Sequence, residues 1–259
     1  MVFCAPDKTF FNFSIVYPSF RHKQKLQTYD SKESGRTYVN VDLSTDGGVE
    51  QAGKAGLASF PLVDAIFTPL FHVSGNEIFN KEFKARLFTL MRHPVDRTVS
   101  EFYTFTQTAA EEVLREMTLE EYINSRYYQG NYMTSFVGKC WSPAVPDDIC
   151  LQWSKELLRT KFVIGIQEDI YGAMELYEDY FFWDYDSPQV KSCKRDVIKS
   201  EFDRNFAVYQ RVGEKIKEDS KMYVSIVEKN AFDMDLYWYA VELQKFQRAW
   251  IPRLTSSPA

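Results

Sequence analysis

The stretch from Leu87 to Phe105, LFTLMRHPVDRTVSEFYTF, constrains the fold of this chain more than any other. It opens with an apolar run at 87–91, and such short runs are typical of buried parallel strands. Pro94 then stands where a helix favours proline, at its first position. The apolar residues that follow recur at steps of three and four, which predicts one buried helix face: Val95, Val99, Phe102 and Phe105. The stretch therefore predicts a strand, a tight turn and a helix.

Arg92 directly follows the predicted strand. In open α/β sheets, ligands bind at the carboxyl ends of the strands. The guanidinium group offers a rigid fork of donors that matches phosphate, and Ser100 on the predicted helix could add a hydroxyl donor. The alternative is an ordinary ion pair between Arg92 and a neighbouring acid, with Ser100 solvated. The chemistry of these residues alone leaves both interpretations open.

The order of residues 92–103, RHPVDRTVSEFY, resembles a nucleotide-binding motif, Arg-x-Pro-x-x-Arg-x-x-Ser-x-(Tyr/Phe). That motif belongs to sulfotransferases that use 3′-phosphoadenosine 5′-phosphosulfate (PAPS). The likeness is strongest to Golgi carbohydrate sulfotransferases of the heparan sulfate 2-O type, and weaker matches extend it from about Tyr38 to Gln247. The resemblance implies that Arg92 and Ser100 hold the 3′-phosphate of PAPS. It also implies a carbohydrate or other hydroxyl acceptor and a location in the Golgi lumen.

The same resemblance implies a catalytic base. In 2-O-type enzymes a histidine in a His-Val-Ser context has this role, and the chain carries His72-Val73-Ser74. An imidazole with a pKa of about 6.5 suits proton abstraction near neutral pH. The alternative for His72 is a partly buried side chain that caps a loop. Glu168 and Asp169, after a predicted strand at 161–166, are second candidates, although the first turn of a helix also favours acids.

The polar segment at 187–205 carries the basic residues Lys191, Lys194 and Arg195. Related enzymes often close a loop over the nucleotide at this place. The resemblance therefore implies that Lys194 and Arg195 contact the cofactor or an acidic glycan, and a solvated loop is the alternative. His93 replaces an aspartate that is common in the family, and we expect it to orient the turn rather than take part in the chemistry.

The loop that holds the 5′-phosphosulfate in this family has no clear counterpart. It reads Pro-Lys-(Thr/Ser)-Gly-(Gly/Thr)-(Ser/Thr) and opens a helix, where its N–H groups and lysine bind phosphate. Lys8, in PDKT, lacks the glycine that a tight turn needs, and Lys54, in GKAG, lies at a predicted helix end. We therefore expect the first strand and its loop to lie upstream of Met1 or to be lost. A catalytically impaired nucleotide- or partner-binding pseudoenzyme of the same fold is the alternative function.

Charge and cysteine content narrow the functional class. A net charge of −5 argues against non-specific nucleic-acid binding. The sequence contains no run of about 18 apolar residues, so we expect no transmembrane helix in it. The cysteines, Cys4, Cys140, Cys150 and Cys193, lack the CxxC spacing of a zinc site, so we expect no metal. Cys140 and Cys150 flank a turn-rich segment and could form a loop disulfide or remain free thiols.

Strands that alternate with helices predict an α/β fold, with a P-loop-like parallel sheet flanked by helices as the resemblance implies. We predict an irregular segment at 1–35, a sulfotransferase-like domain at 36–250 and a tail at 251–259. The aromatic run Tyr237–Tyr239 is expected to pack in the core and against a partner, and a platform for a sugar is the alternative. Besides the central unit, strands are predicted at 37–42, 62–67 and 161–166, and helices at 48–55, 118–125, 147–159, 170–182, 206–216 and 220–247, the last broken near Asn230.

Overall fold

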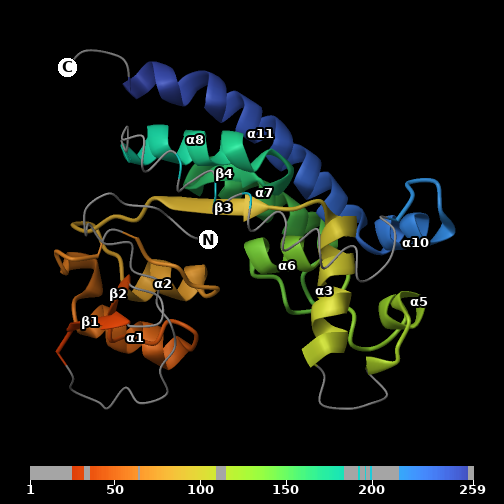
Figure 1. Ribbon diagram of the computed structural model, residues 1–259, viewed down its shortest axis with the longest axis horizontal. Coiled ribbons are helices and arrows are strands. Elements are labelled where there is room, and N and C mark those ends of the chain that lie inside the picture. Colours follow the sequence, from red (N-terminus) through yellow and green to blue (C-terminus); the bar gives the residue numbers. More distant parts are fainter. Residues whose placement is uncertain are drawn as a thin grey trace. The chain divides into compact units, whose positions relative to one another are not determined.

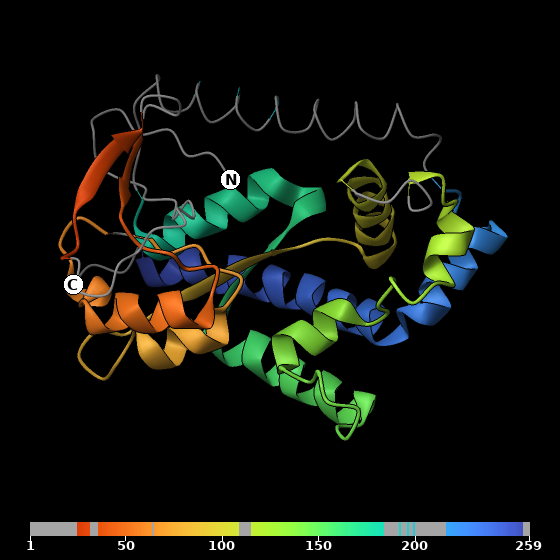
Figure 2. The ribbon, with the colours of Figure 1, turned by 90° about the horizontal axis from the view of Figure 1, so that it is seen from below.

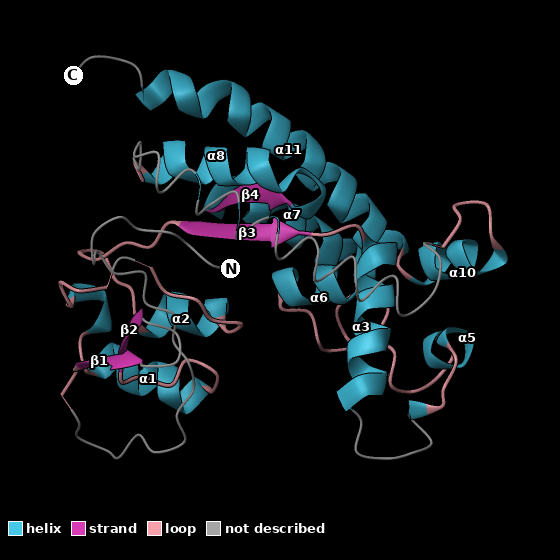
Figure 3. Ribbon diagram, in the orientation of Figure 1, coloured by secondary structure: helices cyan, strands magenta, loops and turns pink. Residues whose placement is uncertain are grey.

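The structure is a computed structural model that describes residues 25–31, 36–63, 65–108, 115–183 and 216–255, with Ser192, Asp196 and Lys199. It is mixed α/β, and its chain contacts form two compact units that divide between Ala85 and Arg86. Ser192 and Asp196 group with the first unit. Figure 3 shows two separate small sheets, drawn in magenta. Within the described ranges, no helix has the length and apolar character needed to cross a membrane.

The first unit contains a two-stranded antiparallel sheet and short helices (Figure 1). Its elements are β1 (Thr28–Ser31), β2 (Arg36–Val39), α1 (Asp46–Lys54), η1 (Leu57–Ser59) and α2 (Phe71–Glu77). Helix α1 begins where the N–H of Gly48 donates to Thr45 Oγ1 at 3.1 Å. It ends before Gly56, whose φ of +83° is the left-handed conformation that glycine adopts without strain. The buried core is mainly aliphatic: Val39, Val41, Leu43, Val49, Ala52, Leu57 and Ile78.

The second unit is built on a parallel pair of strands, β3 (Leu87–Met91) and β4 (Phe162–Ile166). Every residue of β4 is buried. Its other elements are α3 (Pro94–Thr108), α5 (Leu119–Ile123), α6 (Tyr132–Gly138), α7 (Asp147–Lys161), η2 (Gln167–Asp169), α8 (Ile170–Phe181), α10 (Lys221–Lys229) and α11 (Ala231–Thr255). Helices α7, α8 and α11 pack against β4, and α11 runs along the unit from α10 past this strand (Figures 1 and 2).

Side chains from α8 and α11 bond to the backbone of the strand pair. The Gln247 amide of α11 accepts the N–H of Ile164 at 2.9 Å and donates to the carbonyl of Phe162 at 2.8 Å. The buried Tyr177 hydroxyl of α8 donates to the carbonyl of Thr89 at 2.6 Å. Because buried backbone groups need partners, these bonds satisfy the sheet and hold both helices to it.

The first turns of α6 and α11 cap each other. Asn131, just before α6, accepts the N–H groups of Phe232 at 3.0 Å and Asp233 at 3.3 Å through its side-chain oxygen. In return, the Asp233 carboxylate accepts the N–H groups of Met133 at 3.0 Å and Thr134 at 2.8 Å. Residues about 100 positions apart therefore satisfy the donors that both helix starts leave without intrahelical partners.

Most of the predicted elements are present in the described residues. The strand at 87–91 and the helix that begins at Pro94 are confirmed, as is the strand at 161–166, which begins at Phe162. Thr118 and Glu121 form the predicted capping box at the start of α5. The long C-terminal helical region breaks at Asn230, as predicted, and continues to Thr255. The helix predicted at 206–216 lies outside the described residues except for Ile216, which is not helical.

Three predictions about strands and loops are wrong. The described residues of 62–67 form no strand, because Leu62 is exposed while Val63 and Ile66 pack as irregular chain on the core of the first unit. The described part of 1–35, which was predicted to be irregular, contains β1, and β1 pairs antiparallel with β2. The strand predicted at 37–42 is present as β2, although it ends at Val39. Ser192, Asp196 and Lys199 are helical, although 187–205 was predicted to be a loop.

Candidate functional site

Arg92 lies between the carboxyl end of β3 and the start of α3. Helix α3 begins at Pro94, and its first backbone bond runs from the N–H of Arg97 to the carbonyl of His93 at 2.9 Å. The first N–H groups of a helix lack intrahelical partners and carry partial positive charge. The half-buried Arg92 therefore lies two positions before the first residue of a helix. Both features favour an anion.

The Glu168 carboxylate holds this turn from the neighbouring strand. Glu168 follows β4 at the same edge of the sheet as Arg92, since the two strands are parallel. One of its oxygens accepts the main-chain N–H of His93 at 2.9 Å, and the other accepts the Tyr237 hydroxyl at 3.0 Å. Burial raises the pKa of Tyr237, and the negative charge of Glu168 raises it further. Tyr237 therefore stays a neutral donor at ordinary pH.

Two carboxylates act on the Arg92 charge. Burial lowers the pKa of Arg92, while the charges of Asp96 and Glu168 oppose that shift. Arginine nevertheless remains protonated under all ordinary conditions. Ser100 lies four positions after Asp96, so both side chains occupy the same face of α3. The second unit thus places Ser100 on the helix face that carries the acid interacting with Arg92.

Aromatic rings surround the His93 side chain. Its ring lies edge-on to those of Tyr237 and Trp238, with centroids 5.1 and 6.1 Å away, and nearly parallel to that of Tyr223 at 6.5 Å. Tyr237 is buried, as expected for the aromatic run at 237–239, but Trp238 is exposed. Tyr237 is therefore in the core, whereas the packing of Trp238 against a partner stays a prediction, because successive helix positions face different directions.

Arg97, the second arginine of the motif, pairs with an acid of its own helix and contacts residues of two other helices. Its guanidinium lies 2.8 Å from the Glu101 carboxylate and 3.9 Å from that of the fully buried Asp233. It also lies over the Tyr132 ring, 5.3 Å from the centroid. These contacts link α3 to the mutual caps of α6 and α11. Sequence reasoning missed this arrangement because the partners lie far along the chain.

His72 belongs to the first unit and is not among the residues that the second unit brings together. It lies in the first turn of α2, half-buried, with its ring centroid 3.9 Å from that of Phe71. It was expected to follow a strand, but the segment before it forms none. Ser74 of the same His-Val-Ser motif is buried, and its hydroxyl has no hydrogen-bond partner in the described residues.

Of the lysines and arginines that the sequence suggested for binding PAPS outside the Arg92 motif, the structure describes Lys54. Lys54 lies in the last turn of α1 with its side chain 74% exposed, 3.5 Å from the Glu50 carboxylate. It is therefore part of a helix end, and the helix that follows it, η1, has only three residues, whereas a phosphate loop opens a longer α-helix. Lys8, Lys191, Lys194 and Arg195 lie outside the described residues.

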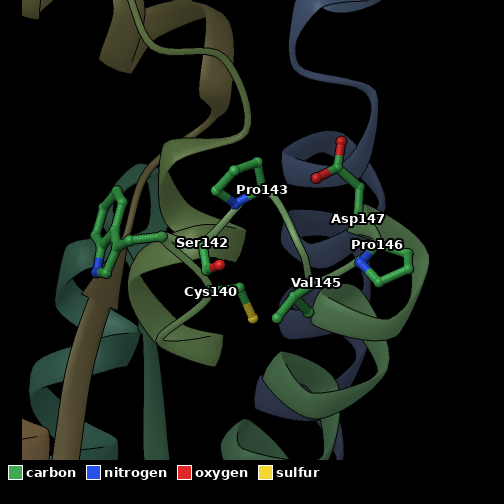
Figure 4. A pocket seen from close by; sticks show the side chains of 7 residues that line it. Cys140, Ser142, Pro143, Val145, Pro146 and Asp147 are labelled. Atoms are coloured by element: carbon green, nitrogen blue, oxygen red, sulfur yellow. The ribbon is translucent and has the colours of Figure 1, made fainter.

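Cys140 and Cys150 form a disulfide, which the sequence left open. A pocket of about 450 Å³ lies beside it, over the segment that connects α6 to α7 (Figure 4). Sequence reasoning did not predict this pocket. The only available signal was a segment with two prolines between two cysteines, which indicates a constrained loop but not a concave one.

The chain matches no known family, no curated protein and no solved structure. The case for any function therefore depends on its own residues and geometry. Among the residues that the structure describes, no group of three or more histidine, cysteine or acidic side chains could hold a metal ion.

Proposed function

We propose that this protein is a PAPS-dependent sulfotransferase that moves a sulfuryl group to a hydroxyl of a carbohydrate. The observation that supports it most is the position of Arg92, which follows a parallel strand and precedes a helix start by two positions. That is the local geometry of an anion site in an α/β fold. The residue order from Arg92 to Ser100 adds the likeness to the PAPS motif.

Each residue of the site has a defined role in this proposal. Arg92 pairs with the 3′-phosphate through two parallel N–H donors, and the Ser100 hydroxyl adds a third donor. Glu168 holds the turn, with Tyr237 behind it. When bound, PAPS supplies the sulfuryl group. Lys194 and Arg195 contribute positive charge near the nucleotide, and His72 takes the proton of the acceptor hydroxyl.

The Cys140–Cys150 disulfide supports a location in an oxidising compartment, for which the Golgi lumen is our proposal. Carbohydrate acceptors fit the same compartment. Disulfides seldom persist in the reducing cytosol, so the pairing and the acceptor class agree.

A nucleotide- or partner-binding pseudoenzyme of the same fold is the second candidate. Among the described residues, no α-helix is opened by a turn that contains both a glycine and a lysine. The described residues thus fit the 3′-phosphate end of PAPS better than its 5′ end. Sulfuryl transfer develops charge at the 5′ end, and loss of one donor there can lower the rate about 10²–10³-fold.

Calorimetry with adenosine 3′,5′-bisphosphate tests the proposed site. We expect Arg92→Ala to weaken binding by about 1.5–3 kcal/mol, the range for a hydrogen bond to a charged group, and Ser100→Ala to weaken it less. Arg159→Ala is the matched control, because Arg159 is an exposed arginine of α7 that pairs with Glu156. Unchanged affinity in Arg92→Ala would contradict the assignment.

Transfer from PAPS to a panel of glycans separates the two candidates. Bisphosphate binding together with sulfated product supports the enzyme. Bisphosphate binding without product supports the pseudoenzyme, and absence of both contradicts the proposed site.

A further inference from the structure

The pocket beside the Cys140–Cys150 disulfide is separate from the Arg92 turn, and the proposed function does not use it. Most of its lining is exposed. Figure 4 shows Pro143 and Asp147 at one end and Cys140 and Val145 at the other. The lining residues are Cys140, Trp141, Ser142, Pro143, Val145, Pro146 and Asp147.

The pocket is formed by a constrained segment. The disulfide joins positions ten residues apart, and the N–H of Val145 donates to the carbonyl of Ser142 at 3.1 Å inside the loop. Two prolines restrict the backbone further, since each has a nearly fixed φ. A binding site that is ordered in advance loses little conformational entropy when a ligand binds.

The chemistry of the lining matches a sugar ring. The Trp141 side chain is 49% exposed and offers a flat apolar surface for the C–H face of a pyranose. The Asp147 carboxylate can accept bonds from ring hydroxyls, and the Ser142 hydroxyl can donate or accept one. The lining is more polar than apolar, which suits a ligand that carries several hydroxyl groups.

Charge selects among sugars. Between Cys140 and Cys150 the chain carries Asp147 and Asp148 but no lysine or arginine. Uronates and sulfated sugars would bring a negative charge next to these carboxylates, and like charges at short range are unfavourable. An uncharged sugar meets no such repulsion.

Contacts between side chains connect the pocket lining to α3, the helix that carries Ser100. The Trp141 ring lies 5.5 Å from the Tyr132 ring, measured between centroids. The Tyr132 ring in turn lies 5.3 Å from the Arg97 guanidinium, in the first turn of α3. Two side-chain contacts therefore connect the pocket to the helix start that follows Arg92.

We propose that this pocket binds an uncharged pyranose unit of the acceptor glycan, at a subsite distinct from the unit that is sulfated. The subsite rests on the proposed function in one respect only, that the glycan bound there is the acceptor of the sulfuryl group. Trp141 supplies the stacking surface, and Asp147 with Ser142 supplies the polar contacts.

Titration of the full chain with two tetrasaccharides tests the subsite. One consists of two uncharged N-acetyllactosamine units, and the other is a fragment of non-sulfated heparosan, which contains uronates. We expect saturation-transfer NMR and calorimetry to show tighter binding of the uncharged glycan. Trp141→Ala should weaken it about five- to tenfold, and Asp147→Asn should reduce the preference over heparosan. Trp153→Ala is the control, because Trp153 is 51% exposed on the neighbouring helix and does not line the pocket.

Three outcomes would overturn the subsite: no binding of the uncharged glycan, equal binding by Trp141→Ala and the unmodified chain, or binding only of a cationic peptide such as trilysine. The affinity for adenosine 3′,5′-bisphosphate, measured on the same samples, distinguishes failure of the subsite from failure of the proposed function. Glycan binding that depends on Trp141 without bisphosphate binding would keep the subsite and reject the sulfotransferase.

Discussion

The main-chain N–H of His93 donates a 2.9 Å hydrogen bond to the Glu168 carboxylate, which joins residues 75 positions apart. The bond connects the turn after β3 to the segment after β4, at the edge of the sheet that carries Arg92. Tyr237 of α11 donates to the other oxygen of the same carboxylate. The conformation of the Arg92 turn therefore depends on two other elements of the second unit.

Glu168 is expected to position the turn, and its variants separate this role from its charge. Glu168→Ala should weaken binding of adenosine 3′,5′-bisphosphate about tenfold, because it removes an acceptor worth about 1.5 kcal/mol or more. Glu168→Gln should stay within about threefold of the unmodified chain, since the amide oxygen can still accept one bond and the repulsion of phosphate is gone. Calorimetry measures both, with Glu175→Ala of α8 as the control. Equal affinity of all variants would argue against positioning.

His72 is expected to act on the proton of the acceptor and not on the nucleotide. His72→Asn should lower turnover about 10²–10⁴-fold, the usual range for loss of a general base, and leave bisphosphate affinity unchanged. A radiolabelled PAPS assay on a chain with transfer activity measures the first effect, and calorimetry the second. Asn76→Ala, an exposed position of the same helix, is the control. Near-normal turnover would leave Glu168, or no protein group, as the base.

Asp233 is expected to be essential for stability. Asp233→Ala would leave the N–H groups of Met133 and Thr134 without their acceptor and Arg97 without one of its two acidic partners. We expect urea unfolding to show a loss of about 3 kcal/mol or more. Asp235→Ala removes a nearby exposed carboxylate that pairs with Lys155, and should cost less than about 1 kcal/mol. Similar losses in the two variants would contradict the capping role.

The ionisation of Asp233 predicts a pH dependence. Burial raises the pKa of Asp233 in the folded chain, although its backbone hydrogen bonds and the Arg97 charge oppose the shift. The folded state therefore binds this proton more tightly than the unfolded state does, and the free energy of unfolding should fall as pH rises from about 4 through the raised pKa. Asp233→Asn should lack this contribution. Urea titrations from about pH 4 to pH 7 give the free energy of unfolding of the unmodified chain and of Asp233→Asn as a function of pH. The same dependence on pH in both would contradict the raised pKa.

The disulfide is expected to stabilise the second unit. It closes a loop between positions ten apart, for which the chain-entropy account gives about 3 kcal/mol. The double variant Cys140→Ser/Cys150→Ser should therefore unfold at lower urea concentration, with a small change in the slope of the transition. A loss below about 1 kcal/mol would mean that the loop keeps its structure without the bond.

Much of the local structure could be predicted from the sequence because its causes lie within a few residues. The capping box at Thr118 and Glu121, the proline at the start of α3 and the apolar run of β3 are such short-range signals. The order of residues around Arg92 also placed the candidate site at a strand end. These features depend on backbone geometry and on neighbouring side chains, which a pattern of adjacent residues contains.

Only the tertiary structure decided which distant residues share the site. The sequence predicted the strands at 87–91 and 161–166, but not that Glu168 accepts the N–H of His93. Nor did it predict that Arg97 approaches Asp233, or that Trp141 contacts Tyr132 beside a pocket. The apolar segment at 62–67 resembles a strand, yet it packs as irregular chain. Contacts between residues tens of positions apart depend on how helices and strands pack, and local propensity does not contain that information.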